Sequence, residues 1–258
     1  MKVIFHPGFH KTGTSTLQAA LRENQNRLWP GIRIIQKEDM PGLTGAAKGY
    51  SVSLKPVELA LVIYEATQVA ERITPDTDTV IITSESLCGQ IPGRDNVPDY
   101  GAAPRLLSTI SAAFDAVHPN AEQSFFFSTR APDAWLKSCH AQHLRASRMR
   151  MPADAYIETY ASSAQLDGIL KAIKSALPSR KVTAVPVEDT GTSRLGMLDH
   201  LLDLTTLQPD QRAMLSPAAW ANRAPPPEQL DAFLRINLSD LSDHDARAAR
   251  LKLNGEIG

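Results

Sequence analysis

Short apolar runs alternate with amphipathic stretches along most of this chain. Five runs rich in β-branched or aromatic residues are expected to be strands, at Lys2–His6, Ile32–Ile35, Thr79–Ser84, Ser124–Thr129 and Lys181–Val187. Helical spacing of apolar residues predicts helices at Thr14–Asn24, Val57–Glu71, Leu106–Val117, from Pro132 to about Arg145, and at Ala153–Ala176 with one break. This alternation predicts a doubly wound α/β fold with a mostly parallel, five-stranded sheet.

Three stretches lie outside this alternation. Residues 36–55 are rich in Gly, Pro and Ser, which predicts a long connection, and residues 86–104 are predicted to be irregular for the same reason. Apolar residues then recur at helical spacing near the end of the chain, so residues 190–258 are expected to be a helical C-terminal extension. A chain of 258 residues can bury one large core, and we predict a single domain over 1–258.

The first strand and the first helix are joined by the loop Pro7–Gly13. The N-terminus of a helix attracts anions, because its backbone N–H groups and its dipole point at the loop. Gly8 and Gly13 let the backbone turn, and Lys11 adds a positive charge. Hydroxyl donors follow at Thr12, Thr14, Ser15 and Thr16. The pattern therefore predicts a site for a phosphate or sulfate, although an ordinary glycine turn with a surface lysine would have the same elements.

The loop string GFHKTGTSTL lacks the GxxxxGK[ST] spacing of a Walker A motif. It resembles instead the nucleotide-binding loop of the sulfotransferases that use 3′-phosphoadenosine 5′-phosphosulfate (PAPS), in which a strand runs into GxxKTGT[ST]xL and then a helix. Every fixed position of that string is met, at Gly8, Lys11, Thr12, Gly13, Thr14, Ser15 and Leu17. The resemblance implies the P-loop-like fold of that family, a 5′-phosphate held by residues 12–16, and Lys11 as a residue that binds and stabilises the sulfate during transfer.

A second string, STRAPDAWLKSCHAQHLR, places Arg130 at the end of a strand and Ser138 eight residues later on a helix. A guanidinium at a strand end can bind a phosphate through two parallel hydrogen bonds. The string resembles R[DN]Px(5)S, with which the same sulfotransferases recognise the 3′-phosphate, except that Ala131 stands where Asp or Asn is usual. The resemblance implies that Arg130 and Ser138 bind this phosphate. Taken alone, Arg130 would more simply be an ion-pair partner at the start of a helix.

Glu85 follows the predicted strand Thr79–Ser84 directly, where ligands of parallel sheets bind. A carboxylate there can accept a proton from an acceptor hydroxyl. In the family that the loop resembles, this position carries the catalytic base, which is a glutamate in the carbohydrate-directed and several bacterial branches. Glu85 could instead cap the next turn or pair with Lys11, and His10 is the alternative base. The RKGxxGxW string of the small-molecule branch is absent, so contacts to the adenine are left open.

Composition restricts the partners. The chain has 27 Lys and Arg against 28 Asp and Glu, and a near-neutral surface does not favour general nucleic-acid binding. An apolar run of about 18 residues, which a membrane span needs, is absent, as are a signal-peptide pattern and metal-ligand spacing. We therefore expect a cytoplasmic protein without a metal. Its expected partners are a nucleotide and an acceptor, with a carbohydrate or glycolipid as the class that the glutamate suggests.

Two further functions remain open from the sequence. A nucleotide kinase or NTPase would share the strand, loop and helix, and Glu85 could then bind magnesium. A non-catalytic nucleotide-binding protein could have kept only the loop. The basic run of Arg145, Arg148 and Arg150 is equally open, as a binding site for an anionic sugar or as a solvated helix face.

Overall fold

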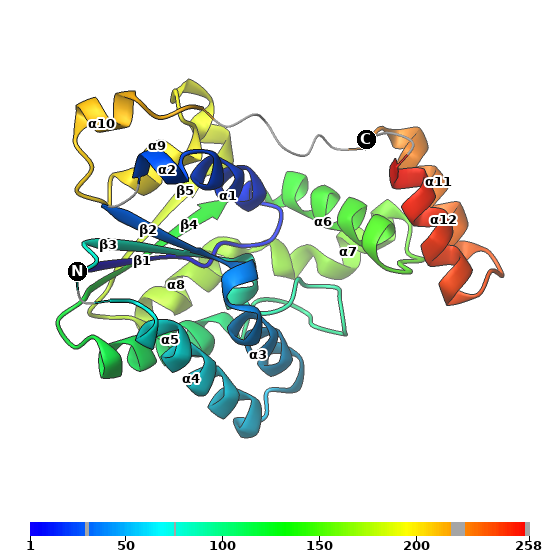
Figure 1. Cartoon of the computed structure of the whole chain (residues 1–258). Coiled ribbons are helices and arrows are strands. Elements are labelled where there is room, and N and C mark those ends of the chain that lie inside the picture. The colour runs from blue at the N-terminus through cyan, green and yellow to red at the C-terminus, as the bar shows by residue number, and fades with distance from the viewer. Residues whose placement is uncertain (29–30, 75, 218–224, 256–258) are drawn as a thin grey trace. The chain divides into compact units, whose positions relative to one another are not determined.

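In the computed structural model of the chain, residues 1–28, 31–74, 76–217 and 225–255 are described (Figure 1). Among them, five strands form one sheet in the order β2-β3-β1-β4-β5, and every neighbouring pair is parallel. The strands are β1 (Lys2–His6), β2 (Ile32–Gln36), β3 (Thr79–Thr83), β4 (Glu122–Thr129) and β5 (Lys181–Pro186). The predicted α/β fold with a parallel five-stranded sheet is confirmed.

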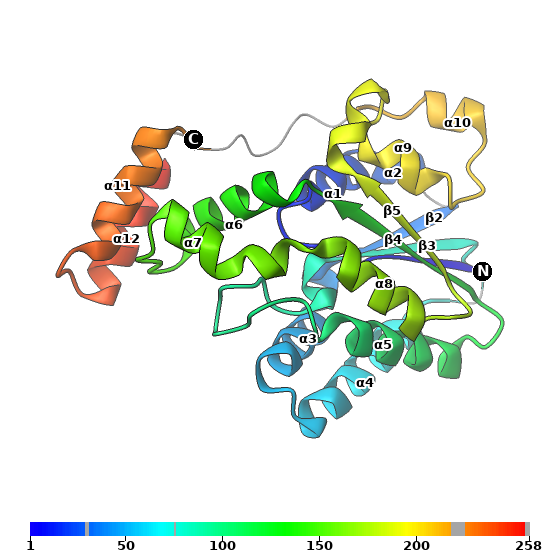
Figure 2. The same ribbon diagram turned by 180° about the vertical axis from the view of Figure 1, so that it is seen from behind.

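The strand order decides which helices cover which face of the sheet. The chain moves from β1 toward the β2 edge and then back across the sheet from β2 to β5, so right-handed crossovers place the connecting helices on opposite faces. One face carries α1 (Thr14–Glu23), α2 (Gln25–Leu28) and α9 (Met197–Leu202), and the other carries α3 (Pro41–Ser53), α4 (Pro56–Glu71), α5 (Ala103–Val117) and α8 (Leu166–Ala176) (Figures 1 and 2). The connection after β1 therefore lies on the opposite face of the sheet from the connections that follow β3 and β4, the two strands beside β1. Ligands of open parallel sheets bind beyond the carboxyl end of such a strand.

A buried apolar cluster fixes α1 against the sheet. Leu17 and Leu21, one helical turn apart, are fully or almost fully buried together with Ile4 of β1 and Phe126 of β4. Leucines of the predicted helical C-terminal extension join the cluster, at Leu195, Leu198, Leu201 and Leu202. Full burial of one such side chain contributes about 1.5–3 kcal/mol, so the start of α1 is held firmly in place.

The predicted connection over residues 36–55 is wrong. The short 3-10 helix η1 (Lys37–Asp39) and then α3 (Pro41–Ser53) occupy this stretch. Gly and Ser have low intrinsic helix propensity, but Pro41 stands at a favourable first position and buried residues such as Leu43 and Ala47 fix the helix in the fold. Tertiary packing has therefore overridden the local composition.

The chain divides into two compact units. The first comprises residues 1–130 and 166–221 and contains the sheet; the second comprises residues 131–165 and 222–258. Helices of the second unit are α6 (Pro132–Ala146), α7 (Ala153–Tyr160), α11 (Pro227–Leu238) and α12 (Asp243–Gly255). The helical C-terminal region is thus present, with α9 and α10 (Pro209–Ala213) in the first unit and α11 and α12 in the second. The single domain over 1–258 stays a prediction.

Candidate functional site

The loop between β1 and α1 is anchored by a buried aromatic ring. Phe9 is fully buried, and its ring centroid lies 4.9 Å from that of Tyr100 and 5.3 Å from that of Phe127. Gly8 has a φ of +53°, and a Cβ there would lie 3.0 Å from the Thr14 hydroxyl oxygen. The loop therefore needs a glycine at this position, both for its backbone conformation and for its close approach to Thr14.

The hydroxyl groups of the loop face different ways. Thr12 Oγ1 donates to the Phe9 carbonyl at 2.7 Å and is hydrogen-bonded to Ser128 Oγ at 2.7 Å, while Thr14 Oγ1 donates to the same carbonyl at 3.2 Å. Both threonines are buried. Their side chains therefore stabilise the conformation of the loop. An anion bound at the loop would contact the backbone N–H groups of these residues. Ser15 is exposed and Thr16 half-buried at the start of α1.

Gly13 marks the start of α1. Its φ of +91° lies in the left-handed region, and a Cβ there would lie 3.2 Å from Cγ2 of Val187. Val187 begins the 3-10 helix η4 (Val187–Thr192), which follows β5. The start of α1 is thus confined between the loop and η4, and its N–H groups keep a fixed direction for an anion.

Arg130 and Lys11 are brought together by the pairing of β4 with β1. Arg130 follows β4 directly, and its Nη1 donates to the Lys11 carbonyl at 3.2 Å. Lys11 itself has a φ of +66°, which is uncommon for a residue with a side chain and costs of order 1 kcal/mol. The contact with Arg130 stabilises this conformation. A guanidinium has five N–H groups, so this bond uses one of them. Ser138 lies half-buried on α6 in the second unit.

Glu85 begins the 3-10 helix η2 (Glu85–Cys88), separated from the end of β3 by one residue. Its Oε2 accepts a hydrogen bond of 3.1 Å from Gln18 Nε2 on α1. Burial of the carboxylate acts to raise its pKa, but the charge of His10 opposes it. Hydrogen bonds from the backbone and from Gln18 and the charge of Lys37 also lower the pKa. The net pKa of Glu85 lies below its ordinary value of 4.5. The carboxylate is therefore ionised at neutral pH, as a base must be.

His6, the last residue of β1, is fully buried. Its Nδ1 is hydrogen-bonded to Thr83 Oγ1 at 2.8 Å, and its buried Nε2 has no hydrogen-bond partner among the described residues. Burial lowers the pKa of His6 to about 4, an effect that the charge of Glu85 partly offsets. The ring is therefore neutral at physiological pH. The sequence predicted His6 as the last residue of a strand and assigned it no chemical role.

His10 is held by a tyrosine from the irregular segment. The Tyr100 hydroxyl group lies 3.0 Å from the His10 backbone nitrogen and 2.9 Å from His10 Nδ1. Sequence reasoning missed Tyr100 and also Gln18, the donor to Glu85. A signal existed for Gln18, since it follows Thr14 by one helical turn and faces the sheet with Leu17. Tyr100 carried no such signal, because it lies 90 residues from His10 in an irregular stretch.

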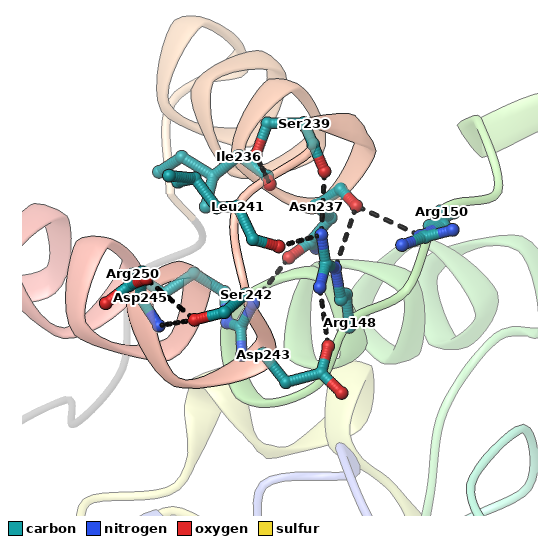
Figure 3. Close-up of polar contacts among 10 residues, drawn as sticks. All are labelled: Arg148, Arg150, Ile236, Asn237, Ser239, Leu241, Ser242, Asp243, Asp245 and Arg250. Carbon is teal, nitrogen blue, oxygen red and sulfur yellow. Dashed lines mark hydrogen bonds and ion pairs between the residues drawn. The ribbon is translucent and has the colours of Figure 1, made fainter.

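Two residues of the basic run, Arg148 and Arg150, belong to a cluster of polar contacts (Figure 3), whereas Arg145 donates to Gln142 Oε1 on its own helix. Arg148 donates to the carbonyls of Asn237, Ser239 and Leu241 at 2.7–3.3 Å and pairs with Asp243 at 2.5 Å. These carbonyls lie at and beyond the end of α11, where the helix leaves them unpaired. Arg148 therefore closes the α11–α12 turn and is not a simple solvated residue, while exposed Arg150 adds one bond of 3.2 Å to the Asn237 carbonyl.

Two absences concern the part of the chain that the structure describes. No group of three or more His, Cys, Asp or Glu residues there could hold a metal ion. Nor does any helix in these ranges combine the length and the apolar character needed to cross a membrane.

The fold has relatives among solved structures. The chain is similar to the crystal structure of a sulfotransferase from Alicyclobacillus acidocaldarius, with a TM-score of 0.44 and 13% sequence identity, over 98% of this chain and 96% of that chain. No family model matches the chain. No curated protein matches it either.

Proposed function

We propose that this protein is a sulfotransferase, which transfers a sulfuryl group from PAPS to a hydroxyl or amine group of an acceptor. The observation that carries the proposal is the loop after β1. Its KTGT sequence stands at the start of α1, Arg130 is bonded to the Lys11 carbonyl, and Glu85 begins the 3-10 helix that follows the adjacent strand β3. A carbohydrate or glycolipid is the proposed acceptor class, on the basis of the glutamate.

The hydrogen-bond donors at the carboxyl end of the sheet fit a nucleotide with several phosphate or sulfate groups. Lys11, the N–H groups at residues 12–16 and the dipole of α1 would bind the 5′-phosphate and the sulfate. Arg130 would bind the 3′-phosphate, for which the sequence resemblance also names Ser138. PAPS would supply an activated sulfuryl group on a phosphate leaving group. Because the Thr12 and Thr14 hydroxyl groups donate to the Phe9 carbonyl, these two residues would bind the phosphate through their backbone N–H groups.

The proposed chemistry needs a base and a stabiliser of negative charge. Glu85 would accept the proton that the acceptor group loses as its oxygen or nitrogen attacks sulfur. Gln18 would hold the carboxylate in position through its hydrogen bond to Oε2. Lys11 would stabilise the charge that builds on the sulfate and on the departing phosphate oxygen, as in phosphoryl transfer.

Calorimetric titration without metal tests the nucleotide. The protein is titrated with 3′,5′-adenosine bisphosphate and then with 5′-AMP. Charge-assisted hydrogen bonds contribute about 1.5–3 kcal/mol, so the bisphosphate is expected to bind roughly tenfold to a hundredfold more tightly. Equal affinities for the two nucleotides would contradict the proposal and would direct the search to ATP and GTP with magnesium.

Replacing Glu85 tests the enzyme. The Glu85→Gln variant is expected to bind the bisphosphate as the unmodified protein does and to lose sulfate transfer by about 10²–10⁴-fold, the usual contribution of a general base. Glu122→Gln is the control, because this exposed residue begins β4 at the opposite end of the sheet. Full turnover in Glu85→Gln would remove Glu85 as the base and leave His10 as the alternative.

A further inference from the structure

Tyr100 is almost completely buried, although it lies in the irregular segment between η2 and α5. Its exposed fraction is 1%, and its ring packs against that of Phe9 with 4.9 Å between the centroids. The Tyr100 carbonyl accepts a hydrogen bond of 2.9 Å from the backbone nitrogen of Ala103, the first residue of α5. A phenylalanine would give the same ring packing, so the contribution particular to a tyrosine comes from its hydroxyl group.

The Tyr100 hydroxyl group contacts His10 at two atoms. The His10 backbone N–H donates to the Tyr100 oxygen at 3.0 Å, and His10 Nδ1 lies 2.9 Å from the same oxygen. An accepted hydrogen bond polarises the O–H group and strengthens it as a donor, and the unprotonated nitrogen of an imidazole is its acceptor. The hydroxyl hydrogen is therefore directed at Nδ1, which places the ring hydrogen of neutral His10 on Nε2.

The orientation of the His10 ring is fixed as well. Its plane lies at 12° to that of the Tyr100 ring, with 6.1 Å between the centroids. Turning the ring over would move Nδ1 away from the hydroxyl group and break the bond between them. Both the position of Nε2 and the presence of a hydrogen on it therefore depend on Tyr100.

His10 lies near both groups that the proposed reaction needs. It precedes Lys11 in the loop after β1, and its charge lowers the pKa of Glu85 through space. A sulfuryl group that moves from a nucleotide at the loop to an acceptor at Glu85 passes between Lys11 and Glu85. An Nε2–H group on His10 is therefore a hydrogen-bond donor close to the point of transfer.

On the basis of the proposed function, we propose that His10 Nε2–H donates a hydrogen bond to an oxygen of the sulfuryl group of PAPS, and that Tyr100 is the positioning residue that fixes this tautomer. His10 Nε2 then already carries a hydrogen, so the proton of the acceptor group goes to Glu85. The bond is made with PAPS alone, because 3′,5′-adenosine bisphosphate has no sulfuryl group. His10 and Tyr100 therefore raise the affinity for PAPS relative to that for the bisphosphate.

Calorimetric titration without metal or acceptor tests this preference, with PAPS and 3′,5′-adenosine bisphosphate as the two ligands. The His10→Asn side chain places its amide near the position of Nδ1 and has no donor at that of Nε2. This variant is expected to bind PAPS roughly tenfold more weakly and the bisphosphate within about twofold of the unmodified protein. The longer His10→Gln side chain places its amide near the position of Nε2 and is expected to recover part of the affinity for PAPS.

A double-mutant cycle tests whether Tyr100 acts through His10. Tyr100→Phe keeps the ring that packs against Phe9 and is expected to weaken PAPS binding about three- to tenfold. The double variant with His10→Asn is expected to bind PAPS about as weakly as His10→Asn alone, because the bond that Tyr100 supports is already lost. A purely structural role of Tyr100 would instead multiply the two losses and would weaken bisphosphate binding equally. Tyr64→Phe is the control, because Tyr64 on α4 is 59% exposed, and it is expected to bind both ligands normally.

NMR of the ¹⁵N-labelled histidine rings tests the tautomer without turnover, with the His10 signals identified by their absence in His10→Asn. At alkaline pH, where the ring is neutral, the hydrogen is expected on Nε2 in the unmodified protein, and Tyr100→Phe is expected to show the Nδ1–H tautomer as well. A hydrogen on Nδ1 in the unmodified protein, equal losses of both ligands in His10→Asn, or multiplied losses in the double variant would overturn this inference alone, while the bisphosphate still binds more tightly than 5′-AMP. Equal affinities for the bisphosphate and 5′-AMP would overturn the proposed function and this inference with it.

Discussion

The buried histidine at the end of β1 should make the stability of the first unit depend on pH. In the unfolded chain His6 has its ordinary pKa of 6.5, and in the folded protein burial lowers that pKa to about 4. Between these values the unfolded state binds a proton that the folded state does not. The stabilisation from neutral His6 is therefore complete above about pH 6.5 and is lost as the pH falls toward 4.

The size of the effect follows from the two pKa values. Their difference corresponds to about 3 kcal/mol at 1.36 kcal/mol per pH unit, and about 2 kcal/mol of this is lost between pH 7 and pH 5. Glu85, whose folded pKa is also lowered, contributes in the same direction, but only below its ordinary value of 4.5. The window from pH 7 to pH 5 therefore isolates the contribution of His6.

Urea unfolding at pH 7 and pH 5 measures this contribution. His6→Asn keeps a polar group near the Thr83 hydroxyl and cannot be protonated, so it is expected to be less stable at pH 7 and to lose about 2 kcal/mol less between the two pH values. His244→Asn is the control, because His244 is 91% exposed and its removal should leave the pH dependence unchanged. An NMR titration of the His6 ring gives its pKa directly. A ring that titrates near 6.5, or a variant with an unchanged pH dependence, would refute the reasoning.

Two further substitutions test structural conclusions. Arg148→Ala removes the bonds to three carbonyls at the end of α11 and should cost about 2 kcal/mol in thermal unfolding, whereas Arg150→Ala removes one longer bond and should cost under about 1 kcal/mol. Gly89→Ala places a Cβ 2.5 Å from that of Ser51 at a φ of +95° and should cost about 2 kcal/mol or more, whereas Gly168→Ala on α8 meets no atom within 4 Å and should stabilise the helix by up to about 1 kcal/mol. Equal losses within either pair would contradict the assigned contacts.

The sheet could be predicted from the sequence because its strands are buried on both faces. Runs such as Thr79–Thr83, in which every residue is buried, carry an apolar signal that is independent of their neighbours. The loop could be predicted because its glycines and its lysine stand at fixed spacing next to a strand. In both cases the information is local, and a short window of sequence contains all of it.

The helix α3 and the exposed apolar side of α4 could not be predicted for the opposite reason. Residues 41–53 contain helix-disfavouring Gly and Ser, and only contacts with distant elements decide their conformation. The spacing of Val57, Leu61 and Tyr64 is visible in the sequence, but it cannot show which apolar residues of α4 face the core. That distinction required the exposed fraction of each side chain.

The candidate site combines both kinds of information. Sequence spacing identifies Lys11, Glu85 and Arg130, which come from three different strand ends, and the parallel pairing of β3 and β4 with β1 places those ends at one edge of the sheet. It does not identify the partners that hold them, because Gln18 and Tyr100 act through contacts that span 67 and 90 residues. The chemical groups of a candidate site can therefore be proposed from the sequence, whereas their orientation and pKa depend on partners that only the folded chain supplies.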